Sequence, residues 1–567
     1  MSIQEKTIAS RIRLGCHVVK MIGVMGALGA LQQASAQGVT AYPSANYSVP
    51  STEILSVTVG GLSVYVEKFQ NYQYAHFAFS GPVECAISVK DKIDSFTIHP
   101  HIRNIQGRAE GNVLRFTLSP DPVKPGYLVV NINKLGKLVL LGDKPEADAP
   151  SPTGAKVHVI TAAPYNADST GKTDVTATIQ KALNDLGAAG GGILYFPPGV
   201  FQVINTLQAK TGVSMYLAPG ARIRSSTNKA DFAGGGFLNP MIETNGVSDF
   251  RIYGRGTWDA SGMALMNWTD TSNRRRLFSG GGLNKNITLD GVILRDATTW
   301  TIVMHNADSC LVRNVKILNH WDQSEIKIQN DGIDLCGSRH GTADANFVIT
   351  GDDAMCAKGD GNETAYLTFK NNIVLSFAAG NKVGMQSTAP VHDILFSHND
   401  VVSCRRGIVV ESLDGALPMT KIKFENISID DYQSLPGWAQ RAVEFLAENA
   451  KIADVEISNT VSYVARDSHL DGMGSGIQNV TFKGLWLADI PVLSAAQGRF
   501  TLNNATNVTF EAGAPPATEL SVHTKRFAPS GTVRVSGGLI LLPSGANGIL
   551  STAYHADGKR LPSVALP

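Results

Sequence analysis

Short runs of alternating apolar and polar residues dominate this chain, and long amphipathic stretches are rare. Between about residues 54 and 141 such runs are separated by turn residues, as in Ala75-His-Phe-Ala-Phe79, Cys85-Ala-Ile-Ser-Val89 and Leu114-Arg-Phe-Thr-Leu118. Alternation with a period of two between turns is typical of antiparallel strands. The pattern therefore predicts a small β-sandwich domain over residues 37–142.

A different pattern begins after this region. Residues 143–156 are rich in proline and polar residues, which predicts a linker. The segment Thr176–Leu186 then places apolar residues at helical spacing, with Asp174 as a candidate N-cap. We expect this helix to close one end of the structure that follows.

A weak repeat fills the rest of the chain. A short alternating strand recurs behind an asparagine, and the intervals of 28 residues from 286 to 314 and from 479 to 507, and of 53 from 426 to 479, suggest one and two repeats. Strand-bearing repeats with almost no helix bury their inward residues by stacking, which predicts a parallel β-helix over residues 157–567. A β-propeller is the alternative, but its blades are longer. The repeated asparagines, expected to stack as a ladder, are Asn286, Asn314, Asn426, Asn479 and Asn507.

The amino-acid composition excludes some classes of binding partner. Lys plus Arg (49) balances Asp plus Glu (48), so no field of one sign attracts nucleic acid or an anionic membrane. The cysteines outside the N-terminal segment lack CxxC spacing, which argues against a zinc site or a dense disulfide framework. One disulfide among the last four and buried free thiols both stay open.

The N-terminus is typical of an export signal. Arg11, Arg13 and Lys20 precede an apolar stretch over residues 21–31, and small residues follow at Ala34-Ser-Ala36. The apolar stretch is shorter than the roughly 20 residues that span a bilayer. We therefore expect residues 1–36 to be a cleaved signal peptide and the mature protein to be secreted, extracellular or periplasmic, without a membrane partner.

Three aspartates lie in the middle of the repeat region. Asp331 precedes the pair Asp352 and Asp353 by about 21 residues, an interval near one coil, so the three can share one face. Adjacent strand residues point to opposite faces, so the pair can share a groove only at a bend or strand end. Carboxylates that close repel, and one should keep its proton near neutral pH. A neutral acid beside ionised carboxylates is what glycosidic bond hydrolysis requires. Turn structure or calcium binding is the alternative.

The same residues carry a family resemblance. Asn330-Asp-Gly-Ile-Asp334 and Gly351-Asp-Asp353 resemble the Asn-x-Asp-Gly-x-Asp and Gly-Asp-Asp motifs of glycoside hydrolase family 28, the polygalacturonases and their relatives. Segments such as Gly190–Gly199 and Ile252–Asp259 look like the opening coils of that superfamily, and the resemblance spans about residues 157–515. It implies a right-handed β-helix and an inverting hydrolase. By position Asp352 matches the general acid, and Asp331 and Asp353 match the pair that activates water, without a metal or cofactor.

Two departures from that family bear on the substrate. Gly380-Asn-Lys382 stands near the family's Gly-His-Gly, and Val409-Val-Glu411 near its Arg-Ile-Lys, whose cations hold the substrate carboxylate. Glu411 would repel a uronate and accept hydrogen bonds from neutral sugar hydroxyls, although Arg405 and Arg406 could compensate. A sandwich before a β-helix is also similar in layout to the dextranases of glycoside hydrolase family 49. The predicted substrate is a neutral or pectic polysaccharide.

Several further residues are predicted to bind the substrate. Lys358, six residues after Asp352, is expected to tune the carboxylates. The predicted substrate-binding residues are Lys358, Lys382, Gln386, Glu411 and Trp321, with Trp300, His305 and His320 as additional candidates.

Two other functions stay open at this point. A polysaccharide lyase on the same fold would need an Arg or Lys base and often calcium. A non-catalytic glycan-binding solenoid is permitted by the fold alone. The N-terminal sandwich is expected to cover the end of the solenoid, although carbohydrate binding is also open.

Overall fold

The structure is a computed structural model that describes residues 38–44, 48–232, 239–265, 274–321, 329–434 and 437–513, together with the backbone of short strands at 34–36, 534–536 and 539–541. The predicted signal peptide lies outside the described residues except for its last three. Most of the region after residue 513 that we assigned to the β-helix also lies outside them. No helix in the described part of the chain is long and apolar enough to cross a membrane.

Two antiparallel-rich sheets form the N-terminal sandwich and enclose a core of Val, Ile, Leu and Phe side chains. The first contains β1 (Ala34–Ala36), β2 (Val39–Ala41), β5 (Val66–Phe69), β6 (Tyr72–Phe79), β8 (Phe96–His99), β11 (Gly126–Ile132) and β12 (Lys137–Asp143). The second contains β3 (Ile54–Val59), β4 (Leu62–Val64), β7 (Val83–Val89), β9 (Gly107–Glu110) and β10 (Val113–Leu118). The 3₁₀ helix η1 (His101–Arg103) follows β8.

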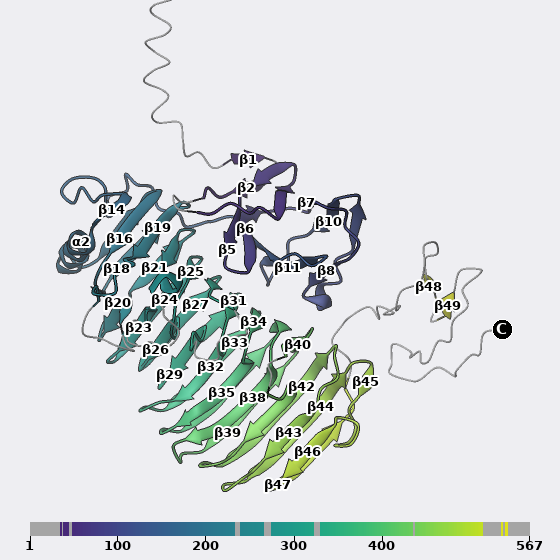
Figure 1. The fold of residues 1–567 in the computed structure, drawn as a ribbon. Helices are drawn as coiled ribbons and strands as arrows, with labels where there is room; N and C mark the ends of the chain where they lie inside the picture. The colour runs from purple at the N-terminus through teal and green to yellow at the C-terminus, as the bar shows by residue number, and fades with distance from the viewer. Residues whose placement is uncertain are drawn as a thin grey trace, which may run out of the picture.

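Parallel strands stack into a long β-helix after residue 156 (Figure 1). One row of strands contains β13 (Val157–Val159), β15 (Gly192–Phe196), β18 (Val213–Leu217), β21 (Arg251–Gly254), β24 (Asn284–Asp290), β27 (Ala307–Arg313), β30 (Thr342–Asp344), β33 (Thr364–Lys370), β36 (Val391–Ser397), β39 (Met419–Glu425), β42 (Ile452–Ser462), β44 (Ile477–Leu487) and β47 (Ala505–Glu511). The second row contains β14 (Thr170–Asp174), β16 (Gly199–Val203), β19 (Ala221–Ser225), β22 (Thr257–Asp259), β25 (Ile293–Arg295), β28 (Lys316–Leu318), β31 (Phe347–Thr350), β34 (Ile373–Ser376), β37 (Asp400–Ser403) and β40 (Ser428–Ile429).

An 11-stranded parallel sheet forms the remaining side of the coil. It contains β17 (Leu207–Gln208), β20 (Pro240–Asn245), β23 (Arg276–Gly281), β26 (Ile302–His305), β29 (Ile333–Cys336), β32 (Met355–Gly359), β35 (Ala379–Ser387), β38 (Arg406–Asp414), β41 (Arg441–Leu446), β43 (Ser468–Asp471) and β46 (Phe500–Asn503). Outside these rows lie α3 (Gly262–Leu265), β45 (Ile490–Pro491), and the paired strands β48 (Arg534–Ser536) and β49 (Leu539–Leu541). Long parallel sheets of this kind are typical of a right-handed β-helix, and the predicted fold class is confirmed.

The register corrects part of the repeat that the sequence suggested. Asn479 and Asn507 do stack, since the Asn507 amide donates to Asn479 Oδ1 at 2.8 Å. Asn286 and Asn314 occupy different corners, because Ile287 lies opposite Cys310 in the next coil. The buried ladder is instead formed by asparagines that the motif missed, Asn346, Asn372 and Asn399, joined by amide hydrogen bonds of 2.9 and 3.0 Å.

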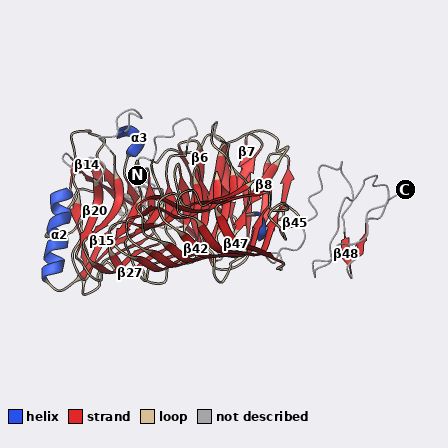
Figure 2. Ribbon diagram, turned by 90° about the horizontal axis from the view of Figure 1, so that it is seen from below, coloured by secondary structure: helices blue, strands red, loops and turns tan. Residues whose placement is uncertain are grey.

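The helix α2 (Thr176–Ala188) closes the first coil, as expected, by burying Ile179, Leu183 and Leu186 against the core (Figure 2). The expectation that the sandwich covers an end of the solenoid is wrong. The sandwich packs against the flank of the β-helix, where side chains such as Tyr72 and Tyr127 meet Phe347 and Ile373 from β31 and β34. Cys85, Cys310, Cys336, Cys356 and Cys404 are all buried free thiols.

A buried ionic cluster joins the two domains on this flank. Asp143, at the end of β12, is fully buried and lies 2.6 Å from Lys316 Nζ and 2.9 Å from Arg255 Nε of the β-helix. Burial lowers the pKa of Lys316 to about 8, while Asp143 opposes that shift. Among the described residues, Asp143 is the one carboxylate within 4.0 Å of either cation.

We expect Asp143→Asn to destabilise the protein by about 3–5 kcal/mol, because it leaves two buried cations without a counter-charge. Urea unfolding followed by intrinsic fluorescence measures the change. The control is Asp94→Asn, which removes an exposed carboxylate 3.8 Å from Lys92 and should leave the midpoint unchanged. A midpoint equally unaffected in Asp143→Asn would contradict this role.

Candidate active site

The outer face of the 11-stranded sheet carries the charged side chains. On β29 and β32 the residues Ile333, Leu335, Met355 and Ala357 point into the core of the coil. The residues between them point outward, because side chains alternate along a strand. Asp334 pairs in register with Cys356, and Cys356 with Lys382, so outward side chains of successive coils form a column.

Asp331 and Asp353 lie one above the other at the entrance to two neighbouring strands. The Gly332 amide donates to the carbonyl oxygen of Asp353 at 2.9 Å, which sets this stacking. Carboxylate oxygens of both residues and the Cys356 sulfur all lie within 4.8 Å of one another. Asp352 and Asp353 lie in the bend before β32, where adjacent side chains need not point to opposite faces.

Lys358 joins two of the carboxylates on the outer face. Its ammonium nitrogen lies 2.7 Å from Asp331 Oδ2 and 3.0 Å from Asp334 Oδ1. It also lies 3.5 Å from the ring centroid of Trp300, which precedes β26. One ammonium is thus shared between two buried carboxylates and an aromatic face.

Lys382 holds the other side of the cluster. Its ammonium nitrogen lies 2.7 Å from Asp353 Oδ2 and 3.0 Å from Glu411 Oε2. Arg406 contacts Glu411 from the far side and lies 2.9 Å from Glu444. The charge of Glu411 is therefore compensated by two cations, which weakens the repulsion of a uronate that the sequence suggested.

The two adjacent aspartates, Asp352 and Asp353, differ in pKa. Burial and the neighbouring Asp353 carboxylate raise the pKa of Asp352 to about 7. Burial would also raise the pKa of Asp353, but Lys382 and Arg406 together hold it well below its usual range. Near neutral pH, one carboxyl of the pair can carry a proton while its neighbour is ionised.

In the third aspartate, Asp331, burial and the neighbouring charges shift the pKa differently. Burial raises the pKa of Asp331 well above its usual range, and Asp334 and Asp352 add to this effect, while Lys358 opposes it. Burial likewise raises the pKa of Asp334. Lys358 is thus shared between two buried carboxylates whose pKa values are both raised by burial.

The three aspartates differ in how much of each residue is exposed to solvent. Asp352 is partly exposed, whereas Asp331 and Asp353 are 3% and 5% exposed. Asp352 is therefore the most accessible of the three aspartates.

One of the predicted substrate-binding residues, Trp321, lies apart from this cluster. The prediction that Trp321 binds the substrate is wrong. Its side chain is 4% exposed in the seam between the domains, with the Lys137 ammonium over its ring and Phe377 against it. It cannot present a face to a sugar there. Gln386 is half-buried towards the end of β35, in register with Asp414.

Sequence reasoning missed several residues near the site. The sequence does point to Asp334, since this residue ends the motif that begins at Asn330. Nothing in the sequence points to Trp438, because it lies more than 80 residues beyond the aspartates along the chain. Its side chain is 49% exposed, and the Arg405 guanidinium carbon lies 4.7 Å from its ring centroid. Among the described residues no carboxylate lies within 4.0 Å of the Arg405 guanidinium, unlike that of Arg406.

Part of the β-helix is similar to known proteins. Residues 159–409 match the family described as rhamnogalacturonase A/epimerase, pectate lyase-like. An endo-polygalacturonase of Pectobacterium carotovorum subsp. carotovorum is 23% identical over 282 residues, which cover 44% of this chain and 68% of that protein.

Two solved structures share the fold. The polygalacturonase from Erwinia carotovora ssp. carotovora superposes with a TM-score of 0.52 at 19% identity and covers 64% of this chain and 99% of its own. Dex49A from Penicillium minioluteum superposes with a TM-score of 0.56 at 11% identity and covers 85% and 100%. Residues 157–567 make up less than three quarters of this chain, so the match to Dex49A extends into the sandwich.

The ionisation of this cluster can be tested directly. We expect a carboxyl group that titrates near pH 7 in infrared difference spectra of the wild type, and we assign it to Asp352. Asp353→Asn removes the neighbouring negative charge, so the Asp352 titration should move to lower pH. As a control, Asp360→Asn removes an exposed aspartate and should leave the titration in place. A band unmoved by Asp353→Asn would contradict the coupling.

Proposed function

We propose that this chain, whose residues 159–409 match the rhamnogalacturonase A/epimerase, pectate lyase-like family, is a secreted glycoside hydrolase that cleaves a polysaccharide with inversion. One observation carries the proposal. Asp352, with a pKa of about 7, lies beside Asp353, which Lys382 and Arg406 keep ionised. A proton donor next to an ionised carboxylate is the minimum that acid-assisted hydrolysis requires.

The proposed roles follow from these ionisation states. Asp352 donates its proton to the glycosidic oxygen as the bond from that oxygen to the anomeric carbon breaks. Asp353, which is ionised, takes the proton of a water molecule that Asp331 helps to orient, as the water oxygen bonds to the opposite face of the same carbon. Exchange with solvent then removes the proton from Asp353 and supplies one to Asp352, which is partly exposed.

The two lysines act through the carboxylates. Lys382 holds Asp353 in its ionised form, which keeps the proton on Asp352. Lys358 fixes Asp331 at 2.7 Å and brings its own charge over the face of Trp300. Both are positioning residues, because the contacts that the structure gives them are with carboxylates and an aromatic ring.

The two lysines of the cluster are poorly placed to serve as the base of a lyase. A lyase base must lose its proton near working pH, but Asp331 and Asp334 hold the pKa of Lys358 well above its usual range, despite the opposing effect of burial. Lys382 is likewise bound between two carboxylates. Neither ammonium is suited to abstract a proton.

The proposed substrate is a neutral or pectic glycan. The family's Arg-Ile-Lys is absent, and Arg406 is committed to Glu411 and Glu444, which favours a neutral sugar. A specific observation favours the pectic alternative, since Arg405 has no carboxylate partner among the described residues and lies against the exposed Trp438. These two residues are candidates for a sugar subsite beside the carboxylates.

We expect Asp352→Asn to lower turnover by at least 10²- to 10⁴-fold while substrate binding persists, because the amide keeps the shape but has no acidic proton. Asp331→Asn and Asp353→Asn should also lower turnover. Reducing-end release and binding of the same polysaccharide are the measurements.

The leaving group distinguishes the acid from the other two aspartates. An activated aryl glycoside that the wild type accepts needs little protonation, so it should partly restore turnover in Asp352→Asn alone. Equal rescue of all three variants, or none, would show that the acid is assigned to the wrong aspartate.

A second prediction concerns the charge of the substrate. Across pectic, α-glucan and other polysaccharides, we expect a neutral glycan to be cleaved faster than polygalacturonate. Any cleavage of polygalacturonate should fall about 10-fold in Arg405→Gln, because a charge-assisted hydrogen bond is lost. Cleavage of methyl-esterified polygalacturonate, the matched uncharged polymer, should not fall. Polygalacturonate as the fastest substrate would contradict the prediction.

A further inference from the structure

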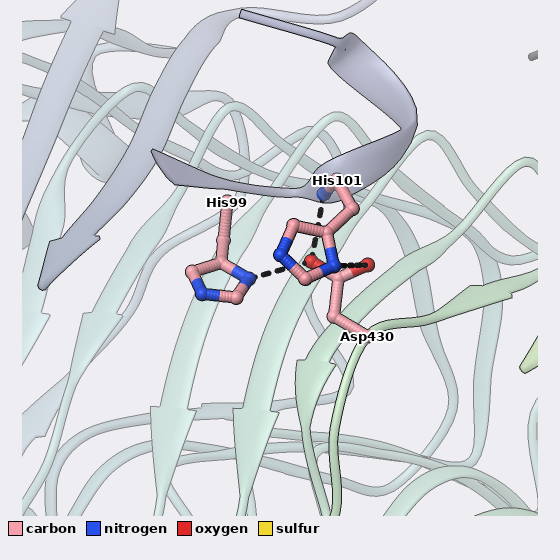
Figure 3. Close-up of side chains that lie close together, drawn as sticks. All are labelled: His99, His101 and Asp430. Atoms are coloured by element: carbon pink, nitrogen blue, oxygen red, sulfur yellow. Dashed lines mark hydrogen bonds and ion pairs between the residues drawn. The ribbon is translucent and has the colours of Figure 1, made fainter. Parts of the chain in front are cut away.

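Two histidines and an aspartate meet at the seam between the domains, on the flank away from the 11-stranded sheet that carries the aspartate cluster. His99 ends β8 and His101 begins η1, both in the sandwich, whereas Asp430 follows β40 in the β-helix (Figure 3). One ring nitrogen of each histidine and a carboxylate oxygen of Asp430 all lie within 4.8 Å of one another. These three residues are called the seam cluster below.

The geometry directs both imidazoles at one carboxylate. His99 Nδ1 lies 2.8 Å from Asp430 Oδ2, and His101 Nδ1 lies 3.9 Å from Asp430 Oδ1. The two rings are 4.3 Å apart between centroids. Thr97 Oγ1 lies 3.0 Å from the other ring nitrogen of His99, which fixes the orientation of that ring.

Asp430 is short of both positive charge and hydrogen bonds. Its side chain is 0% exposed, and no Lys or Arg of the described residues lies within 4.0 Å of it. The His101 amide and His99 both contact Oδ2, while Oδ1 accepts no hydrogen bond from the described residues. A buried carboxylate with an unsatisfied oxygen is costly, so a bound cation would stabilise it.

We propose that the seam cluster binds one transition-metal ion of the Zn²⁺ type, with His99 Nδ1, His101 Nδ1 and Asp430 as ligands. Zn²⁺ binds imidazole nitrogen and carboxylate oxygen at about 2.0–2.2 Å in tetrahedral geometry, which places ligand atoms roughly 3.3 Å apart. The observed 2.8 and 3.9 Å lie on either side of that separation. Three protein ligands leave a fourth position for water.

The donor set selects the class of cation. Two imidazoles suit Zn²⁺, Ni²⁺ or Cu²⁺, whereas Ca²⁺ and Mg²⁺ require mostly oxygen ligands. The other cluster with suitable donors, Asp331, Asp353 and Cys356, is a poorer site because the ammonium groups of Lys358 and Lys382 already lie 2.7 Å from its carboxylates.

The ion would fasten the sandwich to the flank of the β-helix. The histidines come from one domain and the aspartate from the other, so the free energy of binding the ion adds to the free energy of domain docking. This role does not depend on the catalytic proposal, and its test does not require activity.

The experiment uses the mature protein after treatment with a chelator and dialysis. We expect it to bind one equivalent of Zn²⁺ at the seam cluster and to show an apparent Tm higher by about 2–5 °C at saturating Zn²⁺. Ca²⁺ or Mg²⁺ at the same concentration should leave the Tm unchanged. Metal analysis and calorimetric unfolding are the measurements.

His101→Gln should lose one Zn²⁺ equivalent and the Tm shift. His469→Gln is the matched control, since His469 is 27% exposed and lies 3.6 Å from Asp471, against 30% exposure for His101, and it should keep both. If His101→Gln does not fold, anomalous diffraction at the zinc edge from wild-type crystals decides, because it must show a peak between His99, His101 and Asp430. The proposal would be overturned if His101→Gln still bound the equivalent of Zn²⁺, or if the anomalous map showed no peak at the seam cluster.

Discussion

In-register stacking of successive coils is the constraint on which the rest of this structure depends. Parallel strands hydrogen-bond at a spacing of about 4.8 Å, so a residue is held above its counterpart in the preceding coil whatever its side chain. Apolar residues benefit because the inward positions form one continuous core. The same register brings polar residues together on the outside, even where their charges repel, as Asp331 and Asp353 show.

Stacked carboxylates make the outer face electrostatically costly, and the lysines on the same sheet offset that cost. Lys358 and Lys382 each bind two carboxylates, which leaves the group with too few cations to ionise every acid. Crowding of this kind favours the protonated form of a carboxyl group, and burial together with Asp353 raises the pKa of Asp352 to about 7. The ionisation pattern that suits hydrolysis thus follows from charge crowding that the fold itself imposes.

The flank of the β-helix carries an apolar surface that the sandwich covers. The outer faces of β25, β28, β31 and β34 carry large apolar residues, and these would be exposed without the sandwich. The sandwich covers them and adds buried polar contacts at the rim, among them Lys316 with Asp143 and His99 with Asp430. Such pairs require both domains to be in place, because the two partners come from different domains. Docking on the flank also leaves the face that carries the aspartates uncovered by the sandwich.

The sequence by itself determined the strand-rich architecture, because alternation and turn residues are local properties. It also identified Asp331, Asp352 and Asp353 as neighbours, because their spacing is close to one coil. Coil length varies, however, and so the sequence paired Asn286 with the wrong partner and missed the ladder through Asn346, Asn372 and Asn399. Trp321 was assigned to a sugar site because an aromatic residue has the same signature at a domain seam and at a binding surface. The partners of Glu411, the place of Trp438 and the meeting of His99 with Asp430 were decided only by tertiary structure, since each joins segments whose proximity depends on the summed register of intervening coils or on domain docking.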